Sequence, residues 1–131
     1  MSQENVEIVR QAWEAFDRHD NKSALRLYDP EVEIHVGLTG GEVYRGLVGV
    51  EDFFRDWLAT WDDYGSKVEE WIDAGDDVIA VIRVWGRGRQ SGVAAEERQS
   101  HVWTLRHGRL WKLRRYETRA EALKAVGLAD G

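Results

Sequence analysis

The pattern of apolar and polar positions predicts helices in the first half of the chain and strands in the second. An apolar stripe with helical spacing runs through residues 3–18, which is typical of an amphipathic helix. Asp20 and Asn21 offer capping oxygens for a second, short helix, and Pro30 stops that helix. Residues 50–61 repeat the helical spacing and predict a third helix, ended by Gly65.

Strict alternation marks the first predicted strand, at residues 31–36. Val32, Ile34 and Val36 share one face of this strand, and two glutamates share the other face with His35. A glycine-punctuated loop follows at residues 37–49, with a short strand expected near Val43 and Tyr44. The rest of the chain predicts four strands, two tight turns, a longer hairpin loop and a last helix that ends at Gly127. Their expected positions are 67–72, 78–85, 95–105 and 110–117 for the strands, 73–76 and 107–108 for the turns, 86–92 for the loop and 120–126 for the helix.

This order of elements describes an α+β fold. The three helices of the N-terminal half are expected to close one face of a curved antiparallel sheet, which curls into a cone around a central pocket, with a short C-terminal helix at the end. A length of 131 residues suits one core, so residues 1–131 are expected to form a single domain. Seven Trp, four Tyr and three Phe exceed what a core of this size needs, so some are expected to line a cavity or a dimer interface.

Charge and composition exclude several classes of partner. The net charge of −6 argues against binding to nucleic acid phosphates. The absence of cysteine excludes disulfides, thiolate nucleophiles and cysteine-ligated metals. No apolar run approaches the roughly 20 residues of a membrane span, so no membrane partner is expected and the cytoplasm is the expected location. The histidines are scattered, and neither a metal nor a cofactor is expected.

Seven short segments spread over nearly the whole chain carry a family resemblance. They are residues 4–16, 27–33, 44–46, 71–76, 101–109, 119–123 and 127–128. In these segments the chain resembles the SnoaL-like, or polyketide-cyclase-like, branch of the nuclear transport factor 2-like superfamily. The resemblance implies a cone-shaped fold that binds a small hydrophobic molecule, and a homodimer formed through the outer sheet face, with Val102 and Trp85 or their neighbours in the interface.

The resemblance also implies a pair of catalytic histidines. Related steroid isomerases and polyketide cyclases use an acid or base at the end of the first strand, in the position that His35 matches. His101 matches a second acidic or histidine position in the middle of a later strand. An imidazole with a pKa of about 6.5 suits removal of a carbon-bound proton near neutral pH, and a second imidazole can stabilise the enolate oxygen. The two are expected to act across one cavity.

Each histidine also has a second interpretation. His35 shares its face with two glutamates, so it could point to solvent at the strand end. His101 is in register with Trp103 and Leu105 and is therefore expected to face inward. A hydrogen-bonded histidine of the core would show the same pattern.

Aromatic walls and one charged pair complete the expected site. Leu113, Arg115 and Glu117 alternate on the side of the last strand that is expected to face the cavity. The guanidinium could recognise a substrate carboxylate or shift the pKa of a histidine, and the alternative is an ion pair in contact with water at the strand end. The residues expected to bind substrate are Trp13, Tyr44, Trp57, Trp61, Trp103, Leu113, Arg115 and Glu117.

The sequence leaves two functional classes open. The first is a cofactor-free isomerase or cyclase, in the isomerase or lyase class, that acts on a hydrophobic carbonyl compound. The chain departs from that pattern because Ala12 stands where the isomerases place a tyrosine, and histidines stand where the cyclases favour an aspartate. The second class is a non-catalytic ligand-binding or protein-interaction domain. An open cavity of roughly a few hundred Å³ would fit a substrate or ligand, whereas a cone filled by tryptophan would favour an interaction role.

Overall fold

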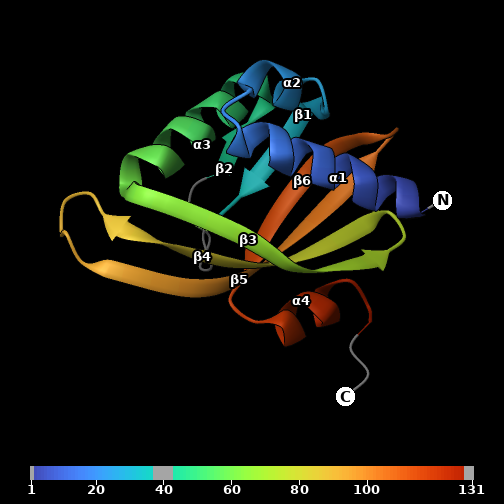
Figure 1. Ribbon diagram of the computed structural model, residues 1–131. Helices are drawn as coiled ribbons and strands as arrows, with labels where there is room; N and C mark the ends of the chain where they lie inside the picture. The colour runs from blue at the N-terminus through green and yellow to red at the C-terminus, as the bar shows by residue number, and fades with distance from the viewer. Residues whose placement is uncertain (1, 37–42, 129–131) are drawn as a thin grey trace.

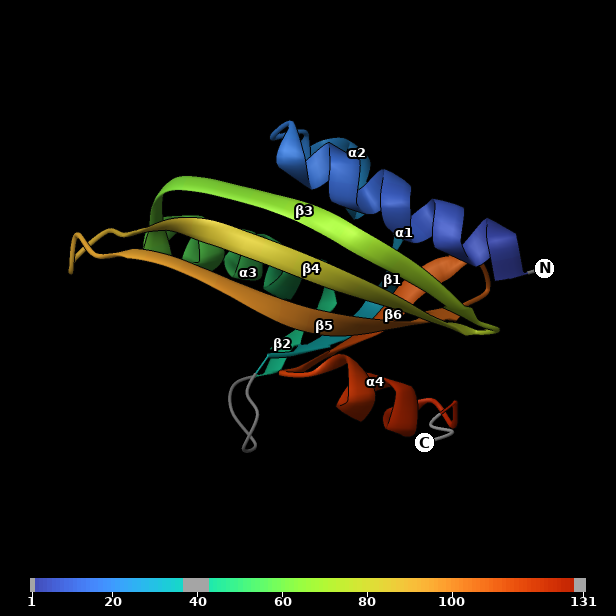
Figure 2. The same ribbon diagram turned by 60° about the horizontal axis from the view of Figure 1, so that its bottom comes forward.

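The computed structural model of the protein describes residues 2–36 and 43–128, and within them it shows a six-stranded curved sheet with helices on both faces (Figures 1 and 2). The helices are α1 (Ser2–Asp17), α2 (Asn21–Leu25), α3 (Gly46–Thr60) and α4 (Arg119–Ala125). The strands are β1 (Tyr28–His35), β2 (Val43–Arg45), β3 (Trp61–Ala74), β4 (Asp77–Gly88), β5 (Ala94–Arg106) and β6 (Arg109–Tyr116). The predicted α+β architecture is confirmed. Residues 37–42 of the predicted glycine-punctuated loop lie outside the described residues.

The strands follow the order β2-β1-β6-β5-β4-β3 across the sheet. Neighbouring strands are antiparallel except β1 and β6, which are parallel and pair Ile34 with Leu113. The predicted antiparallel sheet is confirmed apart from this one pair. The chain reaches β6 only after β2, α3 and the β3–β5 strands, and such a long connection allows parallel pairing.

The main core lies between the inner face of the sheet and helices α1 to α3, which Figure 1 shows together on one side. Alternate residues of β4 face these helices, and Val78, Ala80, Ile82 and Val84 are all buried. The same alternation on β5 turns residues 97, 99, 101 and 103 toward this side, because each pairs with an inward residue of β4. The inner face of β5 therefore carries the polar residues that concern function.

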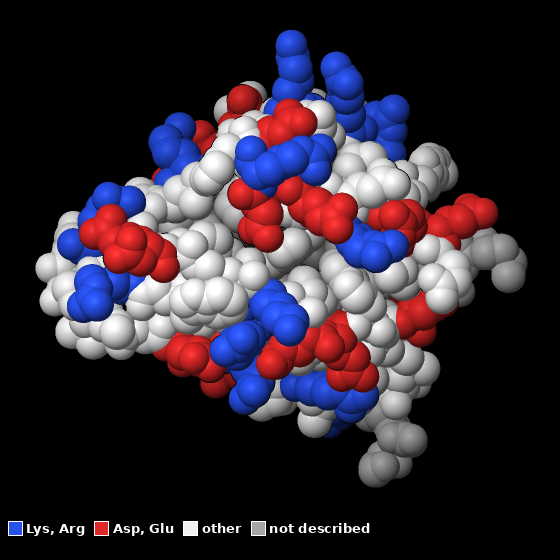
Figure 3. All heavy atoms as spheres, viewed as in Figure 1, with Lys and Arg blue, Asp and Glu red and all other residues white. Residues whose placement is uncertain are grey.

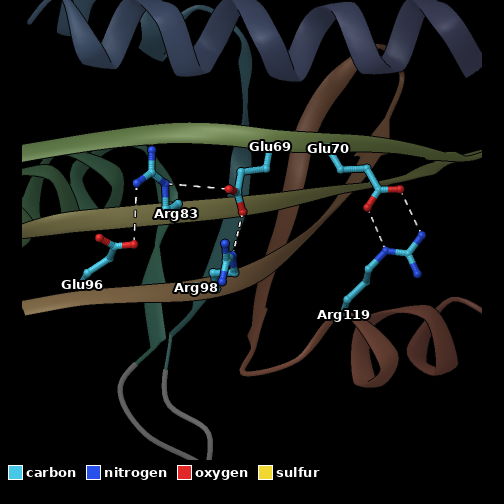
Figure 4. Close-up of polar contacts among 6 residues, drawn as sticks. All are labelled: Glu69, Glu70, Arg83, Glu96, Arg98 and Arg119. Carbon is cyan, nitrogen blue, oxygen red and sulfur yellow. Dashed lines mark hydrogen bonds and ion pairs between the residues drawn. The ribbon is translucent and has the colours of Figure 1, made fainter.

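Helix α4 packs on the opposite, outer face of the sheet (Figure 2). Ala122 on α4 contacts a small cluster that includes Ile79 and Val102, and both of these strand residues are fully buried. Arg119 at the start of α4 donates two hydrogen bonds to Glu70 on β3, at 2.8 and 3.0 Å (Figure 4). Val102 is therefore covered by the chain's own helix, which corrects its expected place in a dimer interface.

The part of the outer face that α4 leaves uncovered carries an ion-pair network (Figure 4). Glu69 on β3 accepts a hydrogen bond from Arg98 at 2.8 Å and lies 3.7 Å from Arg83. Arg83 also lies 3.6 Å from Glu96 and places its guanidinium over the ring of Trp85. Such partly exposed pairs contribute little to stability because water screens them. On the face seen in Figure 3, positive and negative side chains are likewise interspersed.

The start of β3 differs from the expectation drawn from Gly65. Strand β3 begins at Trp61, directly after α3, so Gly65 lies inside the strand rather than at the end of a helix. A Cβ at this position would lie 2.5 Å from the indole of Trp85 on the neighbouring strand. Glycine is therefore required here for the close approach of a ring to the backbone. The predicted turn at His107 and Gly108 is confirmed, and both residues have positive φ as a type I′ turn requires.

Gly49 in α3 provides a test of how closely this helix packs on β2. An added Cβ would lie 2.9 Å from the carbonyl carbon of Tyr44, which is backbone and cannot swing aside. Alanine favours a helix over glycine by about 1 kcal/mol, but overpacking costs about 1–3 kcal/mol. Gly49→Ala is therefore expected to lower the free energy of unfolding in urea by up to about 2 kcal/mol. The exposed neighbour Val48→Ala is the control, and a raised free energy of unfolding for Gly49→Ala would show that β2 moves to accommodate the methyl group.

Candidate functional site

An aromatic cavity lies between α1, α3 and the inner face of the sheet. We call it the inner chamber. Its volume is about 40 Å³, and eight of its twelve lining residues among those described are Trp, Tyr or Phe. The lining residues are Ala12, Trp13, Phe16, Tyr28, Phe53, Phe54, Trp57, Tyr64, Val84, His101, Trp103 and Leu113. The cone is therefore filled largely by its own rings, and the space left at its centre is small.

A second cavity of about 150 Å³ adjoins the first, and we call it the outer chamber. The two chambers share four lining residues, which are Phe53, Trp57, His101 and Leu113. The outer chamber is more polar because it adds Tyr44, Asp56, Thr60 and Arg115, together with Val36. The Tyr44 hydroxyl donates a hydrogen bond of 2.7 Å to Asp56 across its rim.

His101 is the titratable residue common to both chambers. Its side chain comes from the middle of β5, is only 7% exposed, and meets Trp13 edge-on with 6.2 Å between ring centroids. Its Nε2 lies 2.9 Å from Oε1 of Gln99, and the amide nitrogen of Gln99 donates in turn to the carboxylate of Glu97. Its Nδ1 is buried and has no hydrogen-bond partner among the described residues.

Burial lowers the pKa of His101 to about 3, and the positive charge of Arg115 adds to the effect. Arg115 is the direct cross-strand neighbour of His101 in the β5–β6 pair. The imidazole is therefore neutral at neutral pH. This corrects the expectation that its pKa would stay close to 6.5, which was based on an unperturbed ring.

Two hydrogen-bond donors also come from residues of the inner chamber. The indole Nε1 of Trp103 is buried and has no hydrogen-bond partner among the described residues. Burial raises the pKa of the Tyr64 hydroxyl, so this phenol keeps its proton at neutral pH. The chamber thus combines apolar walls with one unpaired acceptor, the Nδ1 of His101, and at least one unpaired donor.

The structure brings most of the predicted site residues together. Four of them line the inner chamber with His101, and two more line only the outer chamber. The inner group is Trp13, Trp57, Trp103 and Leu113, of which Trp57 and Leu113 also line the outer chamber with Tyr44 and Arg115.

His35 lies apart from both chambers. The alternation of β1 turns Ile34 into the core, so the next residue, His35, lies on the other face of the sheet. Its side chain is 38% exposed, and its Nε2 lies 3.0 Å from the carboxylate of Glu33. The expectation that His35 and His101 face each other across one cavity is therefore corrected, because the sheet separates their side chains.

Trp61 and Glu117 are also outside the two chambers. Trp61 opens β3 and packs against Trp57, with 6.2 Å between ring centroids, but lines neither cavity. Glu117 follows the last residue of β6 and is exposed. Of the expected Arg115 and Glu117 pair, only Arg115 lines a chamber, and Glu117 does not take part in the site.

Sequence reasoning missed Gln99, Phe53 and Tyr64. Gln99 stands two residues before His101, so the alternation of β5 already places it on the same face. Phe53 stands four residues before Trp57, so helical spacing places both on one face of α3. Tyr64 gave no usable signal, because the start of β3 was expected after Gly65.

The described residues contain neither a metal-binding cluster nor a membrane-spanning helix. Across residues 2–36 and 43–128, no group of three His, Cys, Asp or Glu side chains is arranged to hold a metal ion. None of the helices in this part of the chain has the length and apolar character needed to cross a bilayer.

Comparison with known proteins identifies the fold. A search of curated proteins found no match. An NTF2-like protein from Burkholderia thailandensis is 28% identical with a TM-score of 0.77, over 96% of this chain and 97% of its own. A protein of ketosteroid isomerase-like fold from Catenulispora acidiphila, in complex with trimethylamine, is 15% identical with a TM-score of 0.73, over 93% of each chain. TerC, co-crystallized with polyporic acid, is 19% identical with a TM-score of 0.75, over 94% of this chain and 98% of its own. Residues 9–113 match the SnoaL-like domain, and the chain therefore belongs to the SnoaL-like domain family.

Proposed function

We propose that the protein binds a small hydrophobic carbonyl compound in the two chambers and catalyses proton transfer at the carbon beside the carbonyl, as a cofactor-free isomerase or cyclase. The observation that carries the proposal is the buried His101, whose Nδ1 has no partner among the described residues. An unpaired basic nitrogen inside apolar walls is the group that such a reaction needs.

In this mechanism His101 acts as the base. Its Nδ1 takes a proton from the α-carbon, and negative charge develops on the carbonyl oxygen. Arg115, whose charge already acts on His101, lines the outer chamber and stabilises that charge electrostatically. The imidazolium then returns its proton to a different carbon in an isomerisation. The catalytic role that the resemblance gave to two histidines thus falls to His101 alone.

The low pKa of His101 is compatible with this role. A general base in ketosteroid isomerase is an aspartate with a pKa of only about 4.6, so a weak base suffices when the enolate is stabilised. A pKa of about 3 keeps His101 unprotonated over the whole physiological range. The imidazolium and the enolate would form together in a dry chamber, where their attraction offsets the cost of burying each charge.

The cavity volumes limit the size of the ligand. The outer chamber has a volume of about 150 Å³, and a cavity of roughly that volume holds one benzene ring. The inner chamber adds only about 40 Å³. These volumes favour a single ring or a short chain over a fused polycyclic compound. Complexes of two proteins of this fold, with trimethylamine and with polyporic acid, support the binding of small organic molecules.

The experiment is α-deuterium exchange of cyclohexanone in D₂O, followed by proton NMR. The wild type is expected to accelerate exchange, and His101→Gln is expected to slow the catalysed rate by about 10²–10⁴-fold. Glutamine retains a donor near the position of Nε2 but removes the basic Nδ1. His35→Gln is the matched control on the outer face and should keep the wild-type rate. An equal rate in His101→Gln, or bound ketone without exchange, would contradict the proposal.

A non-catalytic binding or interaction domain is the second candidate. The observation in its favour is the small inner chamber, because the aromatic side chains occupy most of the cone. Under this alternative, small ketones bind to the wild type, or fail to bind, with no exchange in either case. The same experiment therefore separates the two candidates.

A homodimer and a cytoplasmic location are further parts of the proposal. The surface proposed for the dimer is the outer face of β3 to β5 that α4 leaves uncovered, and it includes the half-buried Trp85. Sedimentation velocity of the wild type and of Trp85→Ala tests the dimer, which the substitution should weaken. Cell fractionation tests the location.

A further inference from the structure

Three inward-facing residues of β5 form a hydrogen-bonded row that runs from the surface into the chambers. Glu97 is exposed, whereas Gln99 and His101 are buried. The amide nitrogen of Gln99 donates to Glu97, and the Nε2 of His101 lies 2.9 Å from the amide oxygen of Gln99. The period of two along the strand brings these side chains to one face.

The row determines which nitrogen of His101 carries the proton. A carboxylate can only accept hydrogen bonds, so Glu97 holds the NH₂ group of Gln99 toward itself. The oxygen of Gln99 then faces His101, and an amide oxygen can only accept. Nε2 must therefore carry the hydrogen of the neutral ring, and Nδ1 keeps a free lone pair.

Two unpaired polar atoms of opposite kind thus belong to the inner chamber. The Nδ1 of His101 is an acceptor and the Nε1 of Trp103 is a donor, and both are buried without a partner among the described residues. Buried polar groups are normally paired, because an unpaired one loses its hydrogen bonds to water without replacement. A hydroxyl group can donate to the first atom and accept from the second.

We infer that the Glu97–Gln99–His101 row makes the chambers selective for a single-ring compound that bears a neutral hydroxyl group, with the hydroxyl donating to Nδ1 of His101. This inference deepens the proposed function and rests on the same site. Phenol has the C=C–OH arrangement of an enol, which the enolate of the proposed reaction becomes when the imidazolium gives its Nδ1 proton to oxygen instead of to carbon. The neutral Nδ1 that results is then the acceptor for that hydroxyl group.

Charge favours a neutral hydroxyl over an ammonium group. No Asp or Glu is among the described residues that line the inner chamber, whereas the outer chamber holds both the cation Arg115 and the carboxylate of Asp56, which accepts the hydrogen bond of Tyr44. An ammonium ion beside His101 in the inner chamber would lose its hydration, find no carboxylate partner there, and meet repulsion from Arg115. A phenol brings no charge, and its ring suits the aromatic walls.

Isothermal titration of the wild type with phenol, anisole and benzylamine tests the ligand class. Phenol is expected to bind at least about tenfold more tightly than anisole, which has the same ring but no hydroxyl hydrogen. Equal affinity for phenol and anisole would overturn the inference. Tighter binding of benzylamine than of phenol would also overturn it, because the site would then select a cation.

Histidine ¹⁵N NMR of the wild type tests the row without any ligand or variant. The Nε2–H form is expected for His101, and the Nδ1–H form would overturn the inference. Gln99→Met keeps the length of the side chain but removes both amide atoms, so the preference for phenol over anisole is expected to fall below about threefold. Gln11→Met, an exposed change on α1, is the matched control and should keep the wild-type preference.

These measurements separate this inference from the proposed function. A preference for phenol with no deuterium exchange in ketones would contradict catalysis and leave the ligand class intact. Exchange that depends on His101, without a preference for phenol, would leave catalysis intact and overturn the ligand class.

Discussion

Phe54→Ala is expected to lower the free energy of unfolding by about 3–5 kcal/mol, the cost of truncating a buried phenylalanine. Phe54 on α3 is only 3% exposed. Its ring centroid lies 4.7 Å from that of Phe16 on α1 and 6.3 Å from that of Tyr28 on β1. It therefore joins two helices to the sheet. These neighbours belong to separate elements, so they cannot all move inward to fill the space that the missing ring leaves.

Urea unfolding of Phe54→Ala and of Val48→Ala makes the comparison on one helix. Val48 is 70% exposed, so its truncation should change the free energy of unfolding by less than about 0.5 kcal/mol. Phe54 also lines the inner chamber, so its removal should enlarge that chamber. Benzene is then expected to raise the melting temperature of Phe54→Ala more than that of the wild type. If Phe54→Ala lowers the free energy of unfolding by less than about 1 kcal/mol, the aromatic cluster repacks around the gap.

The periodicity of the sequence was sufficient to predict most elements, because it records which side of each segment is buried. The alternation of residues 31–36 predicted β1, and it also indicated that His35 shares a face with Glu31 and Glu33. The resemblance to isomerases suggested the opposite face for His35. The structure agrees with the alternation, since packing of Ile34 in the core decides the direction of its neighbour.

Contacts between distant segments could not be predicted in this way. The parallel pairing of β1 with β6 depends on how the chain returns after five intervening elements. The burial of Val102 depends on α4 folding back onto the outer face. The volume of the chambers depends on the rotamers of Phe53 and Trp57, which periodicity leaves open.

The electrostatic state of His101 was beyond sequence reasoning for a similar reason. Its pKa depends on complete burial and on Arg115, which only the register of β5 with β6 places beside it. The row of hydrogen bonds through Gln99 follows from the period of two along β5, but its donor and acceptor order depends on the direction of one amide group. Local alternation predicted that His101 faces inward, and the tertiary structure determines its charge.

Acidification from pH 7 to pH 5 is expected to destabilise the wild type by about 2 kcal/mol more than His101→Gln. The pKa of His101 is lowered from 6.5 to about 3 in the folded protein. Between these two pKa values the unfolded chain binds a proton at this ring and the folded protein does not. The loss of folding stability caused by His101 is therefore absent well above pH 6.5, grows as the pH falls, and stops growing near pH 3.

Urea unfolding of both proteins at pH 7 and at pH 5 measures this difference. Other titrating groups contribute equally to both proteins and cancel, including Asp29, whose pKa is lowered mainly by the backbone N–H of Glu31. The two proteins are compared by the change in their free energy of unfolding between pH 7 and pH 5. Any effect of the substitution on packing that is the same at both pH values therefore also cancels. A wild type that loses no more stability than His101→Gln would show that the ring takes up a proton in the folded state. In that case His101 could not be a neutral acceptor at pH 5, and its lone pair at Nδ1 would be available only at higher pH.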